Sequence, residues 1–394
     1  MTPSMTRRLP APSVRRAGRI VLMVIAVLYA PLAMSYMWFA FVADAPQWQQ
    51  AITAAINGAE YTSGAGSISS IRRVDYLDNT WVLLLHTVLG GLALILAVHQ
   101  LSARRRRRSL VEHRWVGRIY VGLMTISMGA ALVFLVRGGT ADYLGGNAMY
   151  LQLWSLDLST LASGFIAIWA IRRRDVITHQ AWMYLNFAFM MTAPLLRAVW
   201  ILLAPLFPHH SLLDNVDMGS SMLGVLAPGG AAIAVQLSLR SRHDDAAVRA
   251  AASTYVWLLA VAAGSVGLLA LRVDQASAVV PAGVLWIPLG CSVAYTASCL
   301  CGVRGARRAR DAALELRWRW LAWGAAIAPL GVVMVHLASA ILWGYPVGMI
   351  AALMVGFSGP IAVSFTLVVA RIGAPLNFTS PAGPLGHTMR SGRA

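Results

Sequence analysis

Ten apolar stretches, each about as long as the hydrocarbon core of a bilayer is thick, dominate this sequence of 394 residues. A helix needs about 20 consecutive apolar residues to cross a membrane. Charged side chains make up only 12% of the chain, about half of their share in soluble domains. The sequence therefore predicts an all-α, polytopic helical membrane protein with about ten transmembrane helices. The predicted spans are residues 20–43, 80–101, 115–136, 149–171, 181–206, 218–238, 254–271, 279–301, 320–343 and 347–370.

The distribution of arginine predicts the orientation of these spans. All 32 basic residues are arginine, and alternating the loops from a cytoplasmic N-terminus places 26 of them inside, 4 outside and 2 within spans. Arginine-rich loops stay in the cytoplasm, so we expect both termini there, in a multi-pass protein of the bacterial cytoplasmic (inner) membrane. The run Arg104–Arg108 could bind anionic lipid headgroups or a nucleic acid. A role in fixing the topology accounts for it better, and no nucleic-acid partner is expected beside the lipid bilayer.

The spans divide the chain into four regions. Residues 1–19 form a cytoplasmic N-terminal segment, residues 20–240 a six-helix membrane core, and residues 250–371 a four-helix C-terminal membrane region. The cytoplasmic tail 372–394 is rich in Gly, Pro and Ser, so we expect it to be disordered. The long outer loop 44–79 could cover a site that faces outward.

Four ionisable side chains fall inside spans at a similar depth below the predicted outer boundary: His86, Asp157, Arg197 and His336. Such residues are costly in a membrane and usually face the interior of the bundle. Asp157 and Arg197 lie on consecutive spans at matching depth, so they could form an intramembrane ion pair. The pair could lock two helices together, or it could belong to a catalytic or ligand-binding site.

A second polar group marks the predicted cytoplasmic edge, and its members are His99, Gln100, Glu112, His113, Arg114, Arg118 and His179. Gln100 follows His86 by fourteen residues, which places the two about 40° apart on one helix face. His99 is rotated from His86 by about 140°, so it is expected to be a dispensable contact with lipid headgroups.

The fifth span should carry one continuous polar face. His179 and Arg197 are separated by about five helical turns, with Asn186 on the same stripe. Pro194 lies within this span, and we expect the helix to bend there.

Haem b could use this combination of residues. Its iron takes one or two imidazole ligands, and its propionates bind donors such as arginine. The candidate iron ligands are His86, His113 and His179. However, the second histidine that two-haem bundles carry about fourteen residues after the first is replaced here by Gln100, which is not a usual haem ligand. Haem b with an electron-transfer role is the most concrete hypothesis, and another small cofactor or ligand is the broader one.

Two other classes of function remain open. The sequence has no HExxH, GxSxG or P-loop motif, so it does not decide whether the protein is an enzyme. Helix breakers inside spans (Pro228-Gly229-Gly230, Pro329 and Gly359-Pro360) are compatible with a small-molecule transporter or permease, although neighbouring helices commonly satisfy such kinks. A non-catalytic membrane assembly or scaffold protein is the third possibility.

Three segments, in this order, resemble a bacterial polytopic membrane family catalogued as domain of unknown function number 2306. They are His86-Thr-Val-Leu-Gly-Gly through Gln100, His113-Arg114-Trp-Val-Gly117-Arg118-Ile-Tyr120, and His179-Gln-Ala-Trp182-Met183 with Leu196-Arg197. The resemblance covers about residues 80–200, extending at most to 240, and departs at Leu101, where an aromatic residue is expected. It implies a shared site but no assigned reaction. The predicted cofactor-binding residues are His86, Gln100, His113, Arg114, Arg118, His179, Trp182 and Arg197.

Overall fold

A computed structural model of the chain describes residues 12–42, 44–64, 67, 70, 73–138, 146–239 and 252–372. Within these ranges the regular secondary structure is helical and contains no strand, which confirms the predicted all-α class. Almost all of the predicted tail 372–394, and most of the predicted N-terminal segment 1–19, lie outside the described residues. Residues 240–251 also lie outside them, so the predicted boundary between the two membrane regions stays a prediction.

The helices reproduce the predicted spans in number and order. Nine helices of the described chain are long and apolar enough to cross a membrane, and a bent helix pair makes a tenth. The helices at the predicted spans are α1 (Pro12–Met34), α6 (Thr80–Gln100), α8 (Leu110–Gly138), α9 (Gly146–Arg172), α10 (Val176–Met190), α11 (Thr192–Leu206), α12 (Leu212–Ser238), α13 (Ala252–Ala276), α14 (Ala282–Arg308), α15 (Ala312–Trp343), α16 (Tyr345–Val355) and α17 (Ser358–Ile372).

Side-chain caps fix where several of these helices begin. Ser211 forms a capping box with Asp214 at the start of α12, which satisfies two backbone N–H groups that have no partner in the first turn. Asp175 accepts a hydrogen bond from the backbone of Thr178 at the start of α10, and Asp311 caps α15 in the same way. These polar caps lie where the apolar runs begin.

Two spans are interrupted next to a proline. The fifth predicted span consists of α10 and α11, which meet at Met191 with a bend of 40°. Pro194 has no backbone N–H with which to bond the carbonyl of Met190, so the helix cannot continue regularly at this point. The predicted bend near Pro194 is therefore confirmed. Pro360 has the same effect between α16 and α17, whereas α12 and α15 continue as helices through Pro228 and Pro329.

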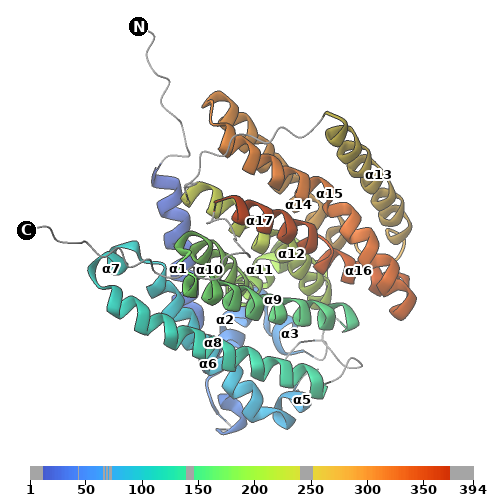
Figure 1. The fold of residues 1–394 in the computed structure, drawn as a ribbon. Helices are drawn as coiled ribbons and strands as arrows, with labels where there is room; N and C mark the ends of the chain where they lie inside the picture. The colour runs from blue at the N-terminus through green and yellow to red at the C-terminus, as the bar shows by residue number, and fades with distance from the viewer. Residues whose placement is uncertain are drawn as a thin grey trace, which may run out of the picture.

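Helix α12 lies in the middle of the bundle, with α6 and α8 towards one side and α13 to α15 towards the other (Figure 1). It packs against α10 and α11 and also against α14 and α16. Close approach depends on glycine: a Cβ on Gly224 would lie 2.2 Å from the carbonyl oxygen of Met354. The hydroxyl of Ser358 donates a hydrogen bond to the carbonyl of Gly224 over 2.7 Å. The interruption between α16 and α17 is thus held against the central helix.

The predicted outer loop 44–79 is not a simple loop, because it contains the short helices α2 (Trp48–Asn57), α3 (Ala59–Ser63) and α5 (Arg73–Asp78). Asn57 donates a hydrogen bond to the carbonyl of Ile201 in α11, over 3.3 Å. Asn215 at the start of α12 donates to the hydroxyl of Tyr61 in α3, over 3.1 Å. The 44–79 segment therefore lies against the ends of α11 and α12, at the end of the bundle where α6 begins. We call this the Thr80 end and the opposite one the Gln100 end.

Candidate functional site

A cavity of about 370 Å³ opens between the helices in the half of the bundle nearer the Thr80 end. Its walls come from α1, α6, α8, α9, α10, α11 and α12, and the break between α16 and α17 also reaches it. Gln49, Thr53 and Tyr61 of the 44–79 segment contribute to the same lining. The 44–79 segment therefore borders this cavity.

One face of α6 carries His86 into this cavity. The Nδ1 atom of His86 lies 3.0 Å from the backbone carbonyl oxygen of Ser127 in α8, and the hydroxyl of Ser127 donates to the carbonyl of His86 over 2.8 Å. Gly90 allows this contact, since a Cβ there would lie 3.0 Å from the hydroxyl oxygen of Ser127. When Nδ1 carries the proton and donates it to this carbonyl, Nε2 is the ring nitrogen that can contact a ligand.

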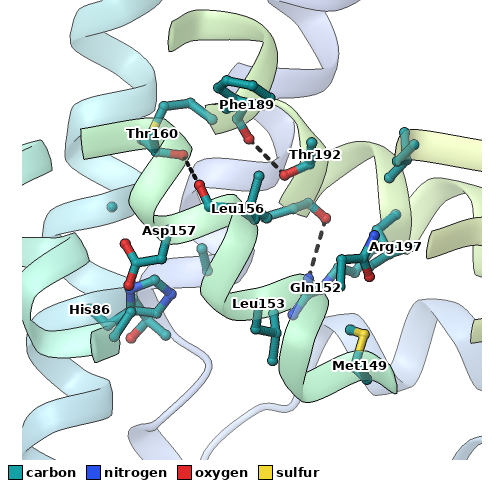
Figure 2. A pocket seen from close by; sticks show the side chains of 18 of the residues that line it. His86, Met149, Gln152, Leu153, Leu156, Asp157, Thr160, Phe189, Thr192 and Arg197 are labelled. Carbon is teal, nitrogen blue, oxygen red and sulfur yellow. Dashed lines mark hydrogen bonds between the residues drawn. The ribbon is translucent and has the colours of Figure 1, made fainter. Parts of the chain in front are cut away.

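Asp157 projects into the cavity from α9 as part of a helical stripe with Leu153, Leu156 and Thr160. Its carboxylate points towards His86 (Figure 2). The residue is only 4% exposed, yet neither carboxylate oxygen has a hydrogen-bond partner among the residues that the structure describes. The nearby hydroxyl of Thr160 donates instead to the carbonyl of Leu156, over 2.7 Å. A buried carboxylate in this state is unusual, because buried charges are normally paired.

Arg197 reaches the cavity from α11, at the side of Figure 2 opposite to Asp157 and His86. Its guanidinium carbon lies 5.3 Å from the ring centre of Trp200 and 6.0 Å from that of Tyr29. One terminal nitrogen contacts the carbonyl oxygen of Ala193 at 3.4 Å, and Nε has no hydrogen-bond partner within the described ranges. Aromatic rings stabilise a cation, but they do not neutralise it.

The predicted ion pair between Asp157 and Arg197 is therefore not formed. Both residues line one cavity, but the two side chains turn in different directions. Arg197 turns towards the aromatic rings of Tyr29 and Trp200, and Asp157 turns towards His86 (Figure 2). Both charges line the same cavity without a direct contact.

Asn186 has a structural role on the predicted polar face of the fifth span. It is fully buried and accepts a hydrogen bond from the hydroxyl of Tyr120 in α8. Its amide donates to the carbonyl of Thr160 over 2.8 Å and to the hydroxyl of Ser163 over 3.1 Å, both in α9. Asn186 thus joins α8, α9 and α10.

The polar residues at the Gln100 end make contacts between helices. The amide of Gln100 donates to the carbonyl of His113 over 3.0 Å, and Nδ1 of His179 lies 2.9 Å from the carbonyl oxygen of Ala167. His99, which the sequence predicts to contact lipid headgroups, has its Nε2 2.9 Å from a carboxylate oxygen of Glu112. Since α6 rises about 1.5 Å per residue, Gln100 and its partner lie about 21 Å from His86 along the helix.

The structure consequently divides the predicted cofactor-binding set between two ends of the bundle. His86 and Arg197 line the cavity, whereas Gln100, His113 and His179 do not. No group of three or more His, Cys, Asp or Glu side chains in the described part of the chain could hold a metal ion. The candidate iron ligands His86, His113 and His179 therefore do not form one site, because helix length separates His86 from the other two.

The remaining predicted residues also lie away from the cavity. Arg114 and Arg118 are exposed, and the guanidinium of Arg118 lies 4.9 Å from the ring centre of Trp115. Trp182 packs edge-on against Phe365, with ring centres 5.4 Å apart. His336 is buried against Tyr345, with ring centres 4.6 Å apart, in the C-terminal group of helices.

Sequence reasoning missed the aromatic and amide residues of the site. Tyr29, Tyr36, Tyr76 and Trp200 line the cavity, with Tyr36 and Tyr76 in edge-on contact at 5.9 Å. Tyrosine and tryptophan are frequent in membrane proteins near the interfaces, so their presence carried no specific signal.

Burial raises the pKa of the Tyr61 phenol, which lies outside the spans, so this group stays neutral and able to donate a hydrogen bond near neutral pH.

Comparison with known proteins identifies a family for the part of the chain that builds most of this cavity. No curated protein and no solved structure matches the chain. Residues 83–227, which include His86, Asp157 and Arg197 and run from α6 into α12, match the family described as "Predicted membrane protein (DUF2306)".

Proposed function

We propose that this membrane protein binds a small amphipathic molecule in the cavity lined by His86, Asp157 and Arg197. The observation that supports this proposal is the set of buried polar atoms in the lining that have no partner among the described residues: both carboxylate oxygens of Asp157, Nε of Arg197 and Nε1 of Trp200. Leaving such groups unsatisfied costs about 1–3 kcal/mol each, and more for charged ones. A ligand that bonds to them would remove this cost.

The size and lining of the cavity agree with this role. Its volume of about 370 Å³ falls within the range of about 300–1,000 Å³ that is usual for ligand pockets. Most of the wall surface is apolar, with residues such as Leu83, Leu94, Phe134 and Leu196, and Asp157 and Arg197 are the charged side chains among the described residues of the lining. Apolar walls with a few placed polar groups are typical of small-molecule sites.

Haem b is a narrower version of the proposal. The Nε2 atom of His86 would supply one axial ligand, and Arg197 would bind a propionate. His86 is the one histidine among the described residues that line the cavity, so these residues fit a haem with a single protein imidazole and do not fit a bis-histidine haem. An absorption spectrum of protein from haem-replete cells tests this version: a Soret band supports it, and its absence contradicts it.

Transport is a second candidate function, favoured by the helix interruptions. Thr192, at the bend between α10 and α11, lines the cavity, and so do Val355 and Ser358 on either side of the break between α16 and α17. In transporters, discontinuous helices commonly meet at the substrate site. In this version the bound molecule moves across the membrane. Proteoliposomes loaded with the identified ligand would show its release only if the protein transports it. A purely structural scaffold would neither bind nor release it.

The arginine distribution supports a location in the bacterial cytoplasmic membrane with both termini inside. In this orientation the Thr80 end faces outward, and the cavity opens towards the 44–79 segment. The ligand would then be taken from the outer side.

The deciding experiment is the analysis of molecules that remain bound to the purified protein. Native mass spectrometry of the parent protein should detect a bound small molecule. Asp157→Asn and Arg197→Gln should reduce its occupancy, because each removes one charged group of the lining. The matched controls are Asp274→Asn and Arg137→Gln, which change exposed residues outside the cavity and should retain the ligand. Equal occupancy in all five proteins would contradict the proposal.

A further inference from the structure

Resting on the proposed binding function, we infer that the ligand is a zwitterion whose anionic group meets Arg197 and whose ammonium group meets Asp157. Among the described residues that line the cavity, Arg197 is the one Arg or Lys and Asp157 the one Asp or Glu. These two charged side chains line the same cavity and do not pair with each other.

The surroundings of Arg197 prepare it for an anion. Its guanidinium lies near the rings of Tyr29 and Trp200, at 6.0 and 5.3 Å from their centres, and its protein hydrogen bond to Ala193 is long, at 3.4 Å. The described chain supplies no carboxylate within ion-pair distance of it. The guanidinium fork matches carboxylate and phosphate groups, which it can bind through two parallel hydrogen bonds.

The surroundings of Asp157 prepare it for a donor that carries positive charge. The carboxylate is 4% exposed and lacks partners for both of its oxygens in the described ranges. The hydroxyl of Thr160, one helical turn further along α9, donates to the carbonyl of Leu156 over 2.7 Å and not to Asp157. An ammonium group has three donors and could satisfy both carboxylate oxygens at once.

Ligands of other classes would pair with only one of the two charged side chains, or with neither. An apolar molecule would leave both charges desolvated and unpaired, which is the costliest arrangement. A simple anion would satisfy Arg197 but place a second negative charge in the same cavity as Asp157. A simple cation would satisfy Asp157 but place a second positive charge in the same cavity as Arg197. A zwitterion with an apolar middle part balances both charges and fits the apolar walls between them.

The part of the lining that comes from the 44–79 segment agrees with a polar ligand. Gln49, Gln50 and Thr53 of α2 and Thr62 of α3 belong to this lining. These side chains place amide and hydroxyl groups on the wall, and α2 is attached to α11 through the hydrogen bond from Asn57 to Ile201. A molecule with two charges would match this polar part of the wall better than a purely apolar molecule would.

A matched set of simple probes tests the inference. The full-length protein in nanodiscs is titrated with ω-amino acids of increasing chain length, and with the fatty acids and the alkylamines of the same lengths. At the best length, the ω-amino acid should bind about tenfold more tightly than either single-charge analogue, because each charge-assisted hydrogen bond is worth at least that factor. Asp157→Asn should remove its advantage over the fatty acid, and Arg197→Gln should remove its advantage over the alkylamine.

The outcomes separate this inference from the proposed function. If fatty acids or alkylamines bind as tightly as the ω-amino acids, or if native mass spectrometry finds a neutral bound molecule, the zwitterion is excluded but a ligand-binding cavity remains. If no probe binds and the purified protein carries no small molecule, both are overturned. Asp274→Asn and Arg137→Gln should leave the order of probe affinities unchanged, and a change in either variant would show that the order does not arise in the cavity.

Discussion

His86 and Ser127 hold each other through three contacts between α6 and α8, the longest of which joins the Ser127 hydroxyl to Nδ1 of His86 at 3.3 Å. The Nδ1 atom of His86 lies 3.0 Å from the carbonyl oxygen of Ser127, and the hydroxyl of Ser127 donates to the carbonyl of His86 over 2.8 Å. The contact with Nδ1 of His86 uses the backbone carbonyl of Ser127, which remains when the side chain of Ser127 is changed. Ser127→Ala should therefore lower the free energy of unfolding by about 0.5–1.5 kcal/mol while leaving ligand affinity within about twofold. Thermal unfolding and ligand titration of the same samples measure both, and a large loss of affinity at unchanged stability would contradict this account.

Substitution of His86, near the Thr80 end, should affect ligand binding differently from substitution of His99 or His179, at the Gln100 end. His86→Ala should reduce ligand binding, since His86 lines the cavity. His179→Ala and His99→Ala should leave binding near the parent value, because both lie at the Gln100 end, about 20 Å away along the helices. Native mass spectrometry of the three variants, matched for expression and membrane insertion, makes the comparison. A loss of ligand in His179→Ala would show that the two ends form one functional unit.

Asp157 and Arg197 should contribute independently to stability. Because no direct contact joins them, the effects of Asp157→Asn and Arg197→Gln on the free energy of unfolding should add to within about 0.3–0.5 kcal/mol in the double variant. A thermal-shift assay of the ligand-free parent, the two single variants and the double variant measures these effects. Recovery of stability in the double variant would instead indicate the ion pair that the sequence suggested.

The packing of α12 against the break between α16 and α17 depends on one glycine. Gly224→Ala would place a Cβ 2.2 Å from the carbonyl oxygen of Met354, so we expect destabilisation by about 1–3 kcal/mol. The matched control is Gly230→Ala on the same helix, where a Cβ meets nothing within 4 Å among the described atoms. Melting temperatures of the two variants give the test, and similar values would mean that this close approach is not needed.

The proposed orientation can be checked with reporter fusions. Fusions after Arg249 and Arg310 should report the cytoplasm, and fusions near Asp142 and Asp214 should report the outside, because 26 of 32 arginines then lie on the cytoplasmic side. An outside signal at Arg310 would contradict the ten-span topology.

The amino-acid sequence by itself determined the spans, their bends and the family region. Apolar length decides whether a segment can cross a bilayer, and it is a local property. The bend between α10 and α11 follows from Pro194, because a missing N–H acts within one helical turn. The sequence also singled out His86, Asp157 and Arg197, which line the cavity, since ionisable groups inside spans are rare.

Only the tertiary structure decided which of these side chains meet. Depth along a helix predicted that Asp157 and Arg197 could pair, but the rotation of each helix and the direction of each side chain depend on its neighbours. Arg197 follows the bend between α10 and α11 and lies near the ring of Tyr29 of α1 instead of contacting Asp157. The helices of the 44–79 segment likewise form against α11 and α12. A cavity between separated charges is a property of packing among helices distant in sequence, and no local pattern specifies such packing.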